Sequence, residues 1–209
     1  MVDCIVVSRR IKLLPLVTPP GKKSHSIIFV IHLLLIFNFR SSKSNEFVGK
    51  VFIKLQMEIR KATFNDFEKI LSLNKDLFLF EKKFTDTFNE DWSYTNQGKE
   101  YFARKIANSN SIFFVAEIDE NIVGYILGYI DSYPVRNINP IVMLDNLFIS
   151  ENYRRKGIGS KLFQEFLKVA KDNGAKRLQV KTYSKNKEAI EFYKKQGFYE
   201  LELVMEHDL

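Results

Sequence analysis

The sequence predicts an α/β layer sandwich, in which helices pack on a mixed β-sheet. Runs that suit β-strands alternate along the chain with longer stretches that have the apolar spacing of amphipathic helices. This alternation is typical of α/β domains, because each helix must bury its apolar stripe against a sheet. The expected domain comprises residues 57–209. A length of about 150 residues is enough for one domain with its own core.

The first half of this domain should contain a short strand, two helices and two strands joined by a turn. Thr63 and Asp66 are three residues apart, and both side chains suit the free N–H groups at a helix start. From Phe67 onward, apolar residues recur at helical spacing. The expected elements are a strand at 57–62, helices at 67–80 and 97–108, and strands at 111–117 and 122–130.

The second half should add two strand–helix pairs and a last strand. Asn139-Pro140 interrupts the chain before an apolar strand, and Asn173-Gly174 ends the helix that follows it. A second helix closes on Gly197, a residue type suited to the left-handed C-terminal cap. The expected elements are strands at 141–149 and 177–183, helices at 158–172 and 186–197, and a last strand from 198 towards 207.

Residues 1–56 form a basic and partly apolar leader that does not follow this pattern. The leader has nine Lys and Arg residues against Asp3 and Glu46, which accounts for the whole net charge of +7. The remaining domain is therefore neutral, so the basic composition gives no reason to expect a nucleic-acid partner. Three interpretations stay open: translated upstream sequence before a native start at Met57, a targeting or membrane-surface segment, and an additional structured element.

The apolar part of the leader is too short to indicate a firm membrane association. It extends from Ile27 to Phe37 and includes His32, whereas a membrane-spanning helix needs about 17–25 apolar residues. Basic residues flank this stretch as in a signal peptide. However, the sequence Phe39-Arg40-Ser41 that follows is a poor cleavage site.

Cysteine and histidine are too scarce for several kinds of chemistry. Cys4 is the only cysteine, and it lies in the leader, so the domain offers no disulfide, zinc cluster or cysteine nucleophile. Two of the three histidines also lie in the leader, and His207 is close to the C-terminus. A Ser-His-Asp triad therefore has no credible histidine. We expect no metal site, and a reducing, cytoplasmic setting.

The most informative motif begins at Arg154, where an apolar strand leads through a glycine turn into an amphipathic helix. Gly157 and Gly159 remove side chains at the point where a ligand must approach the backbone. The first N–H groups of a helix are free and lie at the positive end of its dipole, which favours phosphate. The spacing R-x-x-G-x-G fits neither the dinucleotide fingerprint nor the nucleotide-triphosphate loop.

A second motif follows about thirty residues later, on the last expected helix. Asn186, Ala189, Phe192, Tyr193, Lys195, Gly197 and Phe198 match the pattern N-x-x-A-x-x-F-Y-x-K-x-G-F. Together, the two motifs resemble those of the GCN5-related N-acetyltransferase (GNAT) superfamily, in the same order and on the same elements. The resemblance covers residues 57–209. It implies a GNAT-type layer sandwich with a mixed sheet of about six to seven strands, flanked by about four helices.

The resemblance implies that acetyl-CoA is the co-substrate and an amine the acceptor. Backbone N–H groups of the glycine loop would hold the pyrophosphate, while the backbone of the preceding strand and Asn186 would bond the pantetheine arm. One strand amide would also polarise the thioester carbonyl. The implied cofactor-binding residues are Leu147, Phe148, Ile149, Arg154, Arg155, Lys156, Gly157, Ile158, Gly159, Ser160, Asn186 and Tyr193.

The same resemblance suggests two catalytic residues. Tyr193 would be the general acid that protonates the departing thiolate, since a phenol can donate to a thiolate. Asp145 would accept the proton of the amine, because in a regular strand its side chain shares the face of Leu147. Glu117 and Asp131 are alternatives for this base, which varies within the superfamily. Without a cysteine in the domain, acetyl would pass directly from donor to acceptor in a ternary complex.

The acceptor is less well defined by the sequence than the donor. Between Glu81 and Gln97, acidic residues alternate with aromatic ones, a combination that suits a cationic amine but also occurs in solvated loops. A polyamine, an aminoglycoside-like amine, an amino-acid derivative and a peptide N-terminus remain open. The exposed sheet edges of such a fold are compatible with a homodimer. The alternative function is a non-catalytic acyl-CoA-binding sensor or regulatory module.

Overall fold

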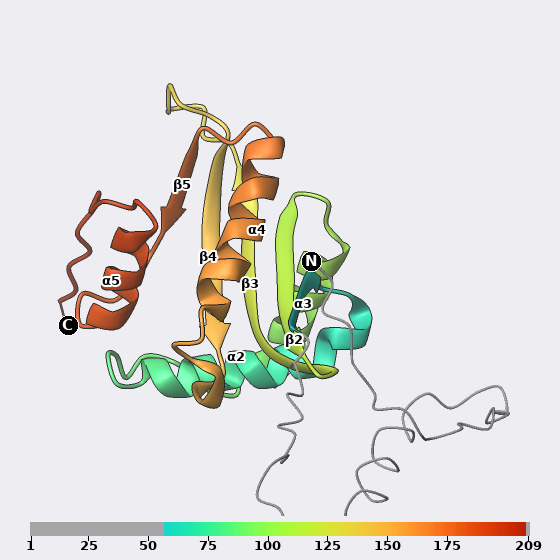
Figure 1. The fold of residues 1–209 in the computed structure, drawn as a ribbon. Coiled ribbons are helices and arrows are strands. Elements are labelled where there is room, and N and C mark those ends of the chain that lie inside the picture. The colour runs from blue at the N-terminus through green and yellow to red at the C-terminus, as the bar shows by residue number, and fades with distance from the viewer. Residues whose placement is uncertain (1–56, 208–209) are drawn as a thin grey trace, which may run out of the picture. The chain divides into compact units, whose positions relative to one another are not determined.

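The fold was taken from a computed structural model, which describes residues 57–207 (Figure 1). The expectations about the leader at 1–56 lie outside the described residues. The elements occur in the order β1 (Met57–Lys61), α2 (Phe67–Glu81), α3 (Asn96–Ala107), β2 (Ser111–Ile118), β3 (Asn121–Asp131), β4 (Ile141–Ile149), α4 (Ile158–Asp172), β5 (Arg177–Val180) and α5 (Lys187–Lys195). Short 3₁₀ turns lie at Phe64–Asp66, Trp92–Tyr94 and Glu151–Tyr153. Each helix predicted from the sequence is present with ends close to those expected.

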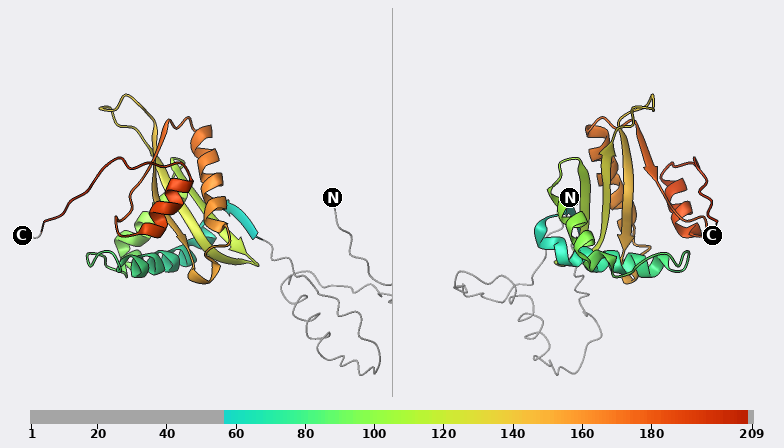
Figure 2. Two further views of the ribbon diagram at one scale, coloured as in Figure 1. Left: turned by 60° about the vertical axis from the view of Figure 1, so that its left-hand side comes forward. Right: turned by 180° about the vertical axis from the view of Figure 1, so that it is seen from behind.

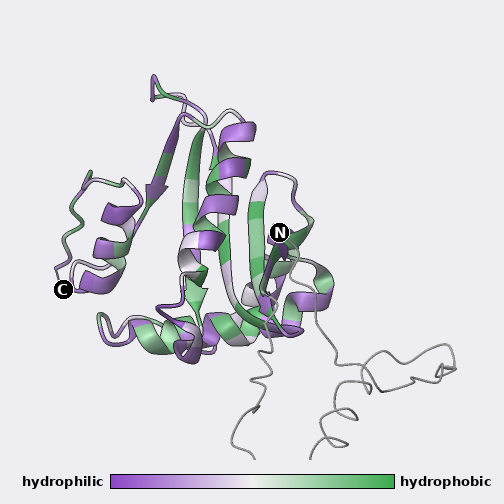
Figure 3. Ribbon diagram, viewed as in Figure 1, coloured by the Kyte–Doolittle hydropathy of each residue, from purple (hydrophilic) through white to green (hydrophobic). Residues whose placement is uncertain are grey.

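The described residues form one mixed sheet in the strand order β1-β2-β3-β4-β5 (Figure 1). Neighbouring strands are antiparallel except β4 and β5, which are parallel. One face packs on α4, whose Leu162, Phe163 and Phe166 are buried. The other face packs on α2 and α3 through residues such as Leu71 and Phe102. Figure 3 shows the apolar residues on the sheet and on the helix faces that cover it.

A polar cluster fixes the start of α2. The backbone N–H of Thr63 donates to Asp66 Oδ2 over 2.8 Å, as the sequence spacing predicted. Asp66 is buried and also accepts hydrogen bonds from Arg60 on β1. These bonds, above all the one from Arg60, hold the pKa of the Asp66 carboxyl below its usual value. The cluster therefore joins the first strand to the first helix.

A β-bulge interrupts β4 at Asp145. Leu127 pairs with Asn146 and the next residue, Gly128, pairs with Leu144, so Asp145 is the additional residue on β4. Leu144 and Leu147 consequently both pack on the α4 side of the sheet. Asp145 instead bonds to Tyr101 of α3, on the opposite side. The expectation that Asp145 shares the face of Leu147 is therefore wrong, because a bulge breaks the two-residue alternation.

The predicted count of six to seven strands is also wrong for the described residues, which form five. The expected last strand does not form: the segment at 198–207 has no strand assignment, and Figure 2 shows it extending from the end of α5. Its Leu203 and Met205 side chains are exposed. An alternating pattern indicates that a segment is able to form a strand, but only pairing with a neighbour makes one.

None of the helices in the described part of the chain is long and apolar enough to cross a membrane.

Candidate active site

The sheet opens between β4 and β5, and this opening lies at the centre of the candidate site. The two strands pair only from Ile141 to Leu144 on β4 and from Arg177 to Val180 on β5. Beyond that point β4 continues to Ile149, with no ladder to β5. Apart from the Ile149 carbonyl, which accepts from Arg154, the backbone N–H and C=O groups of β4 on this side are therefore available to pair with an extended ligand. Figure 1 shows β5 diverging from β4 here.

The glycine loop leads from β4 into the first turn of α4. Gly157 has φ of +78°, a left-handed conformation that a residue with a Cβ adopts only with strain. A Cβ built at this position would meet no atom within 4 Å, so the backbone is open to an approaching ligand. No side chain caps the helix start. The N–H groups of Ile158, Gly159 and Ser160 belong to the first turn and lack intrahelical acceptors. This arrangement fits a pyrophosphate.

The three basic residues of the loop have different surroundings. Arg154 donates from Nε to the carbonyl oxygen of Ile149 over 2.9 Å, and its guanidinium lies 4.6 Å from the centre of the Phe80 ring. Lys156 bonds to the carbonyl oxygen of Asn152. Arg155 is 87% exposed, with only a long ion pair of 3.6 Å to Glu188. Arg154 thus links the loop to α2 through its contact with Phe80, whereas Arg155 extends into solvent.

Asn186 lies at the start of α5 and is buried. Its Oδ1 accepts a hydrogen bond from the backbone N–H of Ala189, so this atom caps the helix. Its Nδ2 donates to no other residue in the described range. The Nδ2 group of Asn186 is therefore available to donate to a ligand arm, as expected, whereas its Oδ1 is already used to cap the helix.

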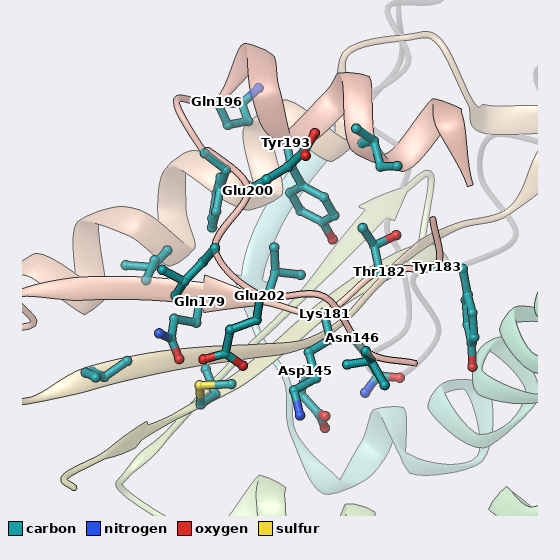
Figure 4. A pocket seen from close by; sticks show the side chains of 18 of the residues that line it. Asp145, Asn146, Gln179, Lys181, Thr182, Tyr183, Tyr193, Gln196, Glu200 and Glu202 are labelled. Atoms are coloured by element: carbon teal, nitrogen blue, oxygen red, sulfur yellow. The ribbon is translucent and has the colours of Figure 1, made fainter. Parts of the chain in front are cut away.

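Tyr193 of α5 and Asp145 of β4 line one large pocket in the described part of the chain. Figure 4 shows the Tyr193 ring pointing from α5 into this pocket. The adjacent Phe192 packs on Phe163 of α4, which fixes the orientation of the short helix. Burial raises the pKa of the Tyr193 phenol above its usual value, and the charge of Glu81 raises it further. The phenol is therefore protonated at neutral pH and can act as a proton donor.

The Asp145 carboxylate accepts a hydrogen bond from the hydroxyl of Tyr101 on α3. The ammonium of Lys105 lies near this pair, 3.7 Å from the centre of the Tyr129 ring. Burial lowers the pKa of Lys105, and the charge of Asp145 opposes this change. Asp145 is thus held at the pocket by neighbouring side chains and is not a free carboxylate.

A buried hydrogen-bond network supports the floor of the pocket next to Asp145. The Nδ2 of Asn74 donates to the hydroxyl of Tyr125 over 3.1 Å and to Asn146 Oδ1 over 3.2 Å. The Tyr125 hydroxyl donates to the same Asn146 oxygen over 3.2 Å. The network links α2, β3 and β4 directly beside the bulge. It therefore holds the bulged strand in place.

The structure brings together only part of the predicted site. The pocket has Asp145 and Tyr193 in its lining, whereas the glycine loop, Asn186 and the end of β4 lie outside it. The alternative bases are not among the residues that line this pocket: Glu117 is paired with Arg60, and Asp131 accepts from the N–H of Ser132. Sequence reasoning missed Tyr101, Asn74 and Asn146. No local pattern marked them, because each acts through a contact with a distant element.

No group of three or more His, Cys, Asp and Glu residues suited to hold a metal ion occurs within 57–207.

Comparison with known proteins identifies the family. A family model described as the acetyltransferase (GNAT) family matches residues 78–198, more than half of the 209-residue chain. The chain belongs to the GNAT family of acetyltransferases. An N-alpha-acetyltransferase of Sulfurisphaera tokodaii is 28% identical over 156 residues, covering 71% of this chain and 84% of that protein. An uncharacterized N-acetyltransferase of Bacillus subtilis, YhfO, is 30% identical over 148 residues, covering 69% and 91%.

A solved structure shows the same fold. The PaiA N-acetyltransferase of Thermoplasma acidophilum in complex with coenzyme A has a TM-score of 0.61 to this chain at 23% identity. The match covers 69% of this chain and 91% of that one. GNAT enzymes take an acetyl group from acetyl-CoA, and membership of the family makes this chain an acetyl-CoA-dependent acetyltransferase.

Proposed function

We propose that the domain at 57–209 transfers acetyl from acetyl-CoA directly to a primary amine within a ternary complex. The observation that carries this proposal is the pocket at the opening between β4 and β5, where Tyr193 and Asp145 come from separate elements. Direct transfer is consistent with the absence of cysteine from this part of the sequence, since no thiol is available for an acetyl-enzyme intermediate.

The donor would bind along β4 and the start of α4. The unpaired side of β4, from Asp145 to Ile149, offers backbone groups to the pantetheine arm, as in the addition of a strand to a sheet edge. One of these amides would also polarise the thioester carbonyl. Free N–H groups of the first turn of α4 would receive the pyrophosphate. Arg155 would add a cation at the rim, since 87% of its side chain is exposed.

Tyr193 would protonate the thiolate that leaves when the carbon–sulfur bond breaks. Its hydroxyl points into the pocket, and its raised pKa keeps the proton in place until a base as strong as a thiolate forms nearby. Asp145 would face the acceptor, held by Tyr101. The non-catalytic sensor is less favoured, because a ligand-binding module has no need of a buried phenol directed into the pocket.

The test is release of free thiol from acetyl-CoA by the full chain. Polyamines, aminoglycosides, amino acids and short peptides would be supplied in turn, with product mass confirming an added acetyl group. We expect release with one class of amine and none without acceptor. If acetyl-CoA binds by calorimetry but no amine supports release, the proposed transfer to small or peptide amines is wrong.

A further inference from the structure

One wall of the pocket is aromatic and is assembled from two distant parts of the chain. Phe78 at the end of α2 stacks on Phe88 with ring centres 4.6 Å apart and an angle of 9° between the planes. Phe84 stacks on Tyr183, which follows β5, at 6.0 Å. All of these rings line the pocket, and Figure 4 shows Tyr183 on its border. The wall suits an apolar or aliphatic group.

Glu81 is the acidic residue that α2 contributes to this wall. It is three residues after Phe78 and seven after Asn74, so the three lie on one side of the helix and line the pocket together. Two neighbouring carboxylates are already paired. Asp91 accepts from Lys75 over 2.6 Å, and Glu90 lies 2.7 Å from Lys82. Within the described range, the Glu81 carboxylate has neither an ion pair nor a hydrogen bond.

The surroundings of Glu81 favour its neutral form more than those of an ordinary surface glutamate. Burial raises the pKa of its carboxyl to about 7. Burial raises the pKa of Tyr193 on α5, Tyr183 after β5 and Tyr125 on β3, and the charge of Glu81 adds to each rise. The pocket lining also includes other titratable side chains, among them Tyr101 of α3, Asp145 of β4, Lys181 and Lys185 after β5, Lys187 and Lys194 of α5, and Glu200, Glu202 and Glu206 after α5. A carboxyl group that titrates near neutrality, lines the same pocket as the proposed acid and influences its pKa is well matched to proton transfer.

We propose that Glu81 takes the proton of the acceptor ammonium, and that the aromatic wall holds an apolar group next to that ammonium. The acceptor class is then a single primary ammonium beside an apolar stem, as at the N-terminus of a peptide with an apolar first residue. This inference rests on the proposed acetyl transfer and assigns its proton acceptor. In this role Glu81 replaces Asp145, because the Asp145 carboxylate already accepts a hydrogen bond from Tyr101.

The proposed acetyl transfer needs two proton transfers, one before and one during breakage of the carbon–sulfur bond. The ammonium gives one proton to the Glu81 carboxylate, which later loses it to solvent. The neutral amine nitrogen then forms a bond to the thioester carbon. As the carbon–sulfur bond breaks, Tyr193 gives its proton to the sulfur and regains one from the new amide nitrogen. The products are an N-acetyl amine, coenzyme A thiol and one proton.

The experiment compares Glu81→Gln with wild type across pH, using the full chain and peptides with an apolar first residue. The base must be deprotonated, so wild-type kcat/KM should rise as pH increases through about 7 and then level off. In Glu81→Gln this rise near 7 should be lost and replaced by one at the pKa of the free peptide amine, about 8, because only the neutral amine can then react. The value of kcat/KM should fall most near neutral pH, by up to about 100-fold, the contribution expected of a general base. Affinity for acetyl-CoA, measured by calorimetry, should not change.

Glu90→Gln is the matched control, because Glu90 is a nearby carboxylate already paired with Lys82. It should retain both the wild-type rate and the wild-type pH profile. If Glu81→Gln does not fold, Glu81→Asp serves instead and should keep the pH-dependent rise at a lower rate.

A Glu81→Gln enzyme with the wild-type rate and profile would overturn the assignment of Glu81 while leaving acetyl transfer intact. Faster acetylation of a peptide with an acidic first residue than of one with Met in that place would overturn the acceptor class. Wild-type silence towards every amine would reject the proposed function and this inference with it.

Discussion

The two halves of the candidate site are built differently. The proposed donor half is a continuous stretch from the end of β4 through the glycine loop to the first turn of α4, and it presents mainly backbone groups. The proposed acceptor half combines side chains of α2, α3, β4, the segment after β5, and α5. A site made of backbone follows from local conformation, whereas a site made of side chains depends on how distant elements pack. Variants in the two halves should therefore have different effects.

Tyr193→Phe should have the largest effect, because Tyr193 would protonate the sulfur as the carbon–sulfur bond of the thioester breaks. Removing a general acid typically lowers kcat at least about 100-fold. Binding of acetyl-CoA should be nearly unchanged, since the ring itself remains. Stopped-flow thiol release and calorimetry would measure the two quantities. Tyr94→Phe, in an exposed tyrosine that does not line the pocket, is the control and should behave as wild type. Equal turnover in Tyr193→Phe and wild type would remove Tyr193 from the chemistry.

Gly157→Ala should affect the donor half alone. The new Cβ meets no atom of the protein, but it strains a backbone with φ of +78° and covers N–H groups meant for the pyrophosphate. Loss of one charge-assisted bond of about 1.5–3 kcal/mol should raise KM for acetyl-CoA about tenfold or more, with a smaller change in kcat.

Gly174→Ala is a matched control for Gly157→Ala, because Gly174 has φ of +76° with open space around it at the other end of α4. It should cause a similar loss of stability in urea unfolding and leave KM for acetyl-CoA unchanged. A similar rise in KM in both variants would show that Gly157 acts through helix stability alone.

Asp145→Asn and Tyr101→Phe test the other carboxylate of the acceptor half. Because these two residues are hydrogen-bonded to each other, either change should lower kcat/KM by less than about tenfold, and the double variant should be no worse than either single one. Both should keep the pH-dependent rise near neutrality. If Asp145→Asn instead lost this rise, Asp145 would be the base and the assignment to Glu81 would be wrong.

Asp66→Asn should change stability without changing the site. The pKa of Asp66 is lowered chiefly by its bond from Arg60, so its stabilising contribution is complete above the unfolded pKa of about 4 and is lost as pH falls through the lower folded value. The partly exposed Arg60 limits the cost at neutral pH to about 1–2 kcal/mol in urea unfolding. Asp76→Asn, at an exposed position of α2, should cost almost nothing. A destabilisation by Asp66→Asn that is as large at acidic pH as at neutral pH would contradict this account.

Several features of the fold followed from the sequence because their causes are local. The ends of α2 and α4 were predicted closely, since capping residues and glycines act within a few residues of the helix end. The last strand was not, since its alternating residues have the right pattern but no paired neighbour in the structure. The face of Asp145 was also wrong, because a bulge depends on the register with β3.

The sequence by itself determined the family and the position of the glycine loop, and it led to the proposal of Tyr193 as the acid, because two motifs with strict spacing carry these features. Only the tertiary structure decided which carboxylates of the acceptor half are free. In the sequence, nothing distinguishes Asp91, Glu90 and Asp145 as carboxylates with a partner. In the fold, Lys75 pairs with Asp91, Lys82 pairs with Glu90, and Tyr101 donates a hydrogen bond to Asp145. Glu81 has no such partner within the described range and faces the aromatic wall. Pairing and burial arise between residues far apart in the chain, so they appear only once the chain has packed.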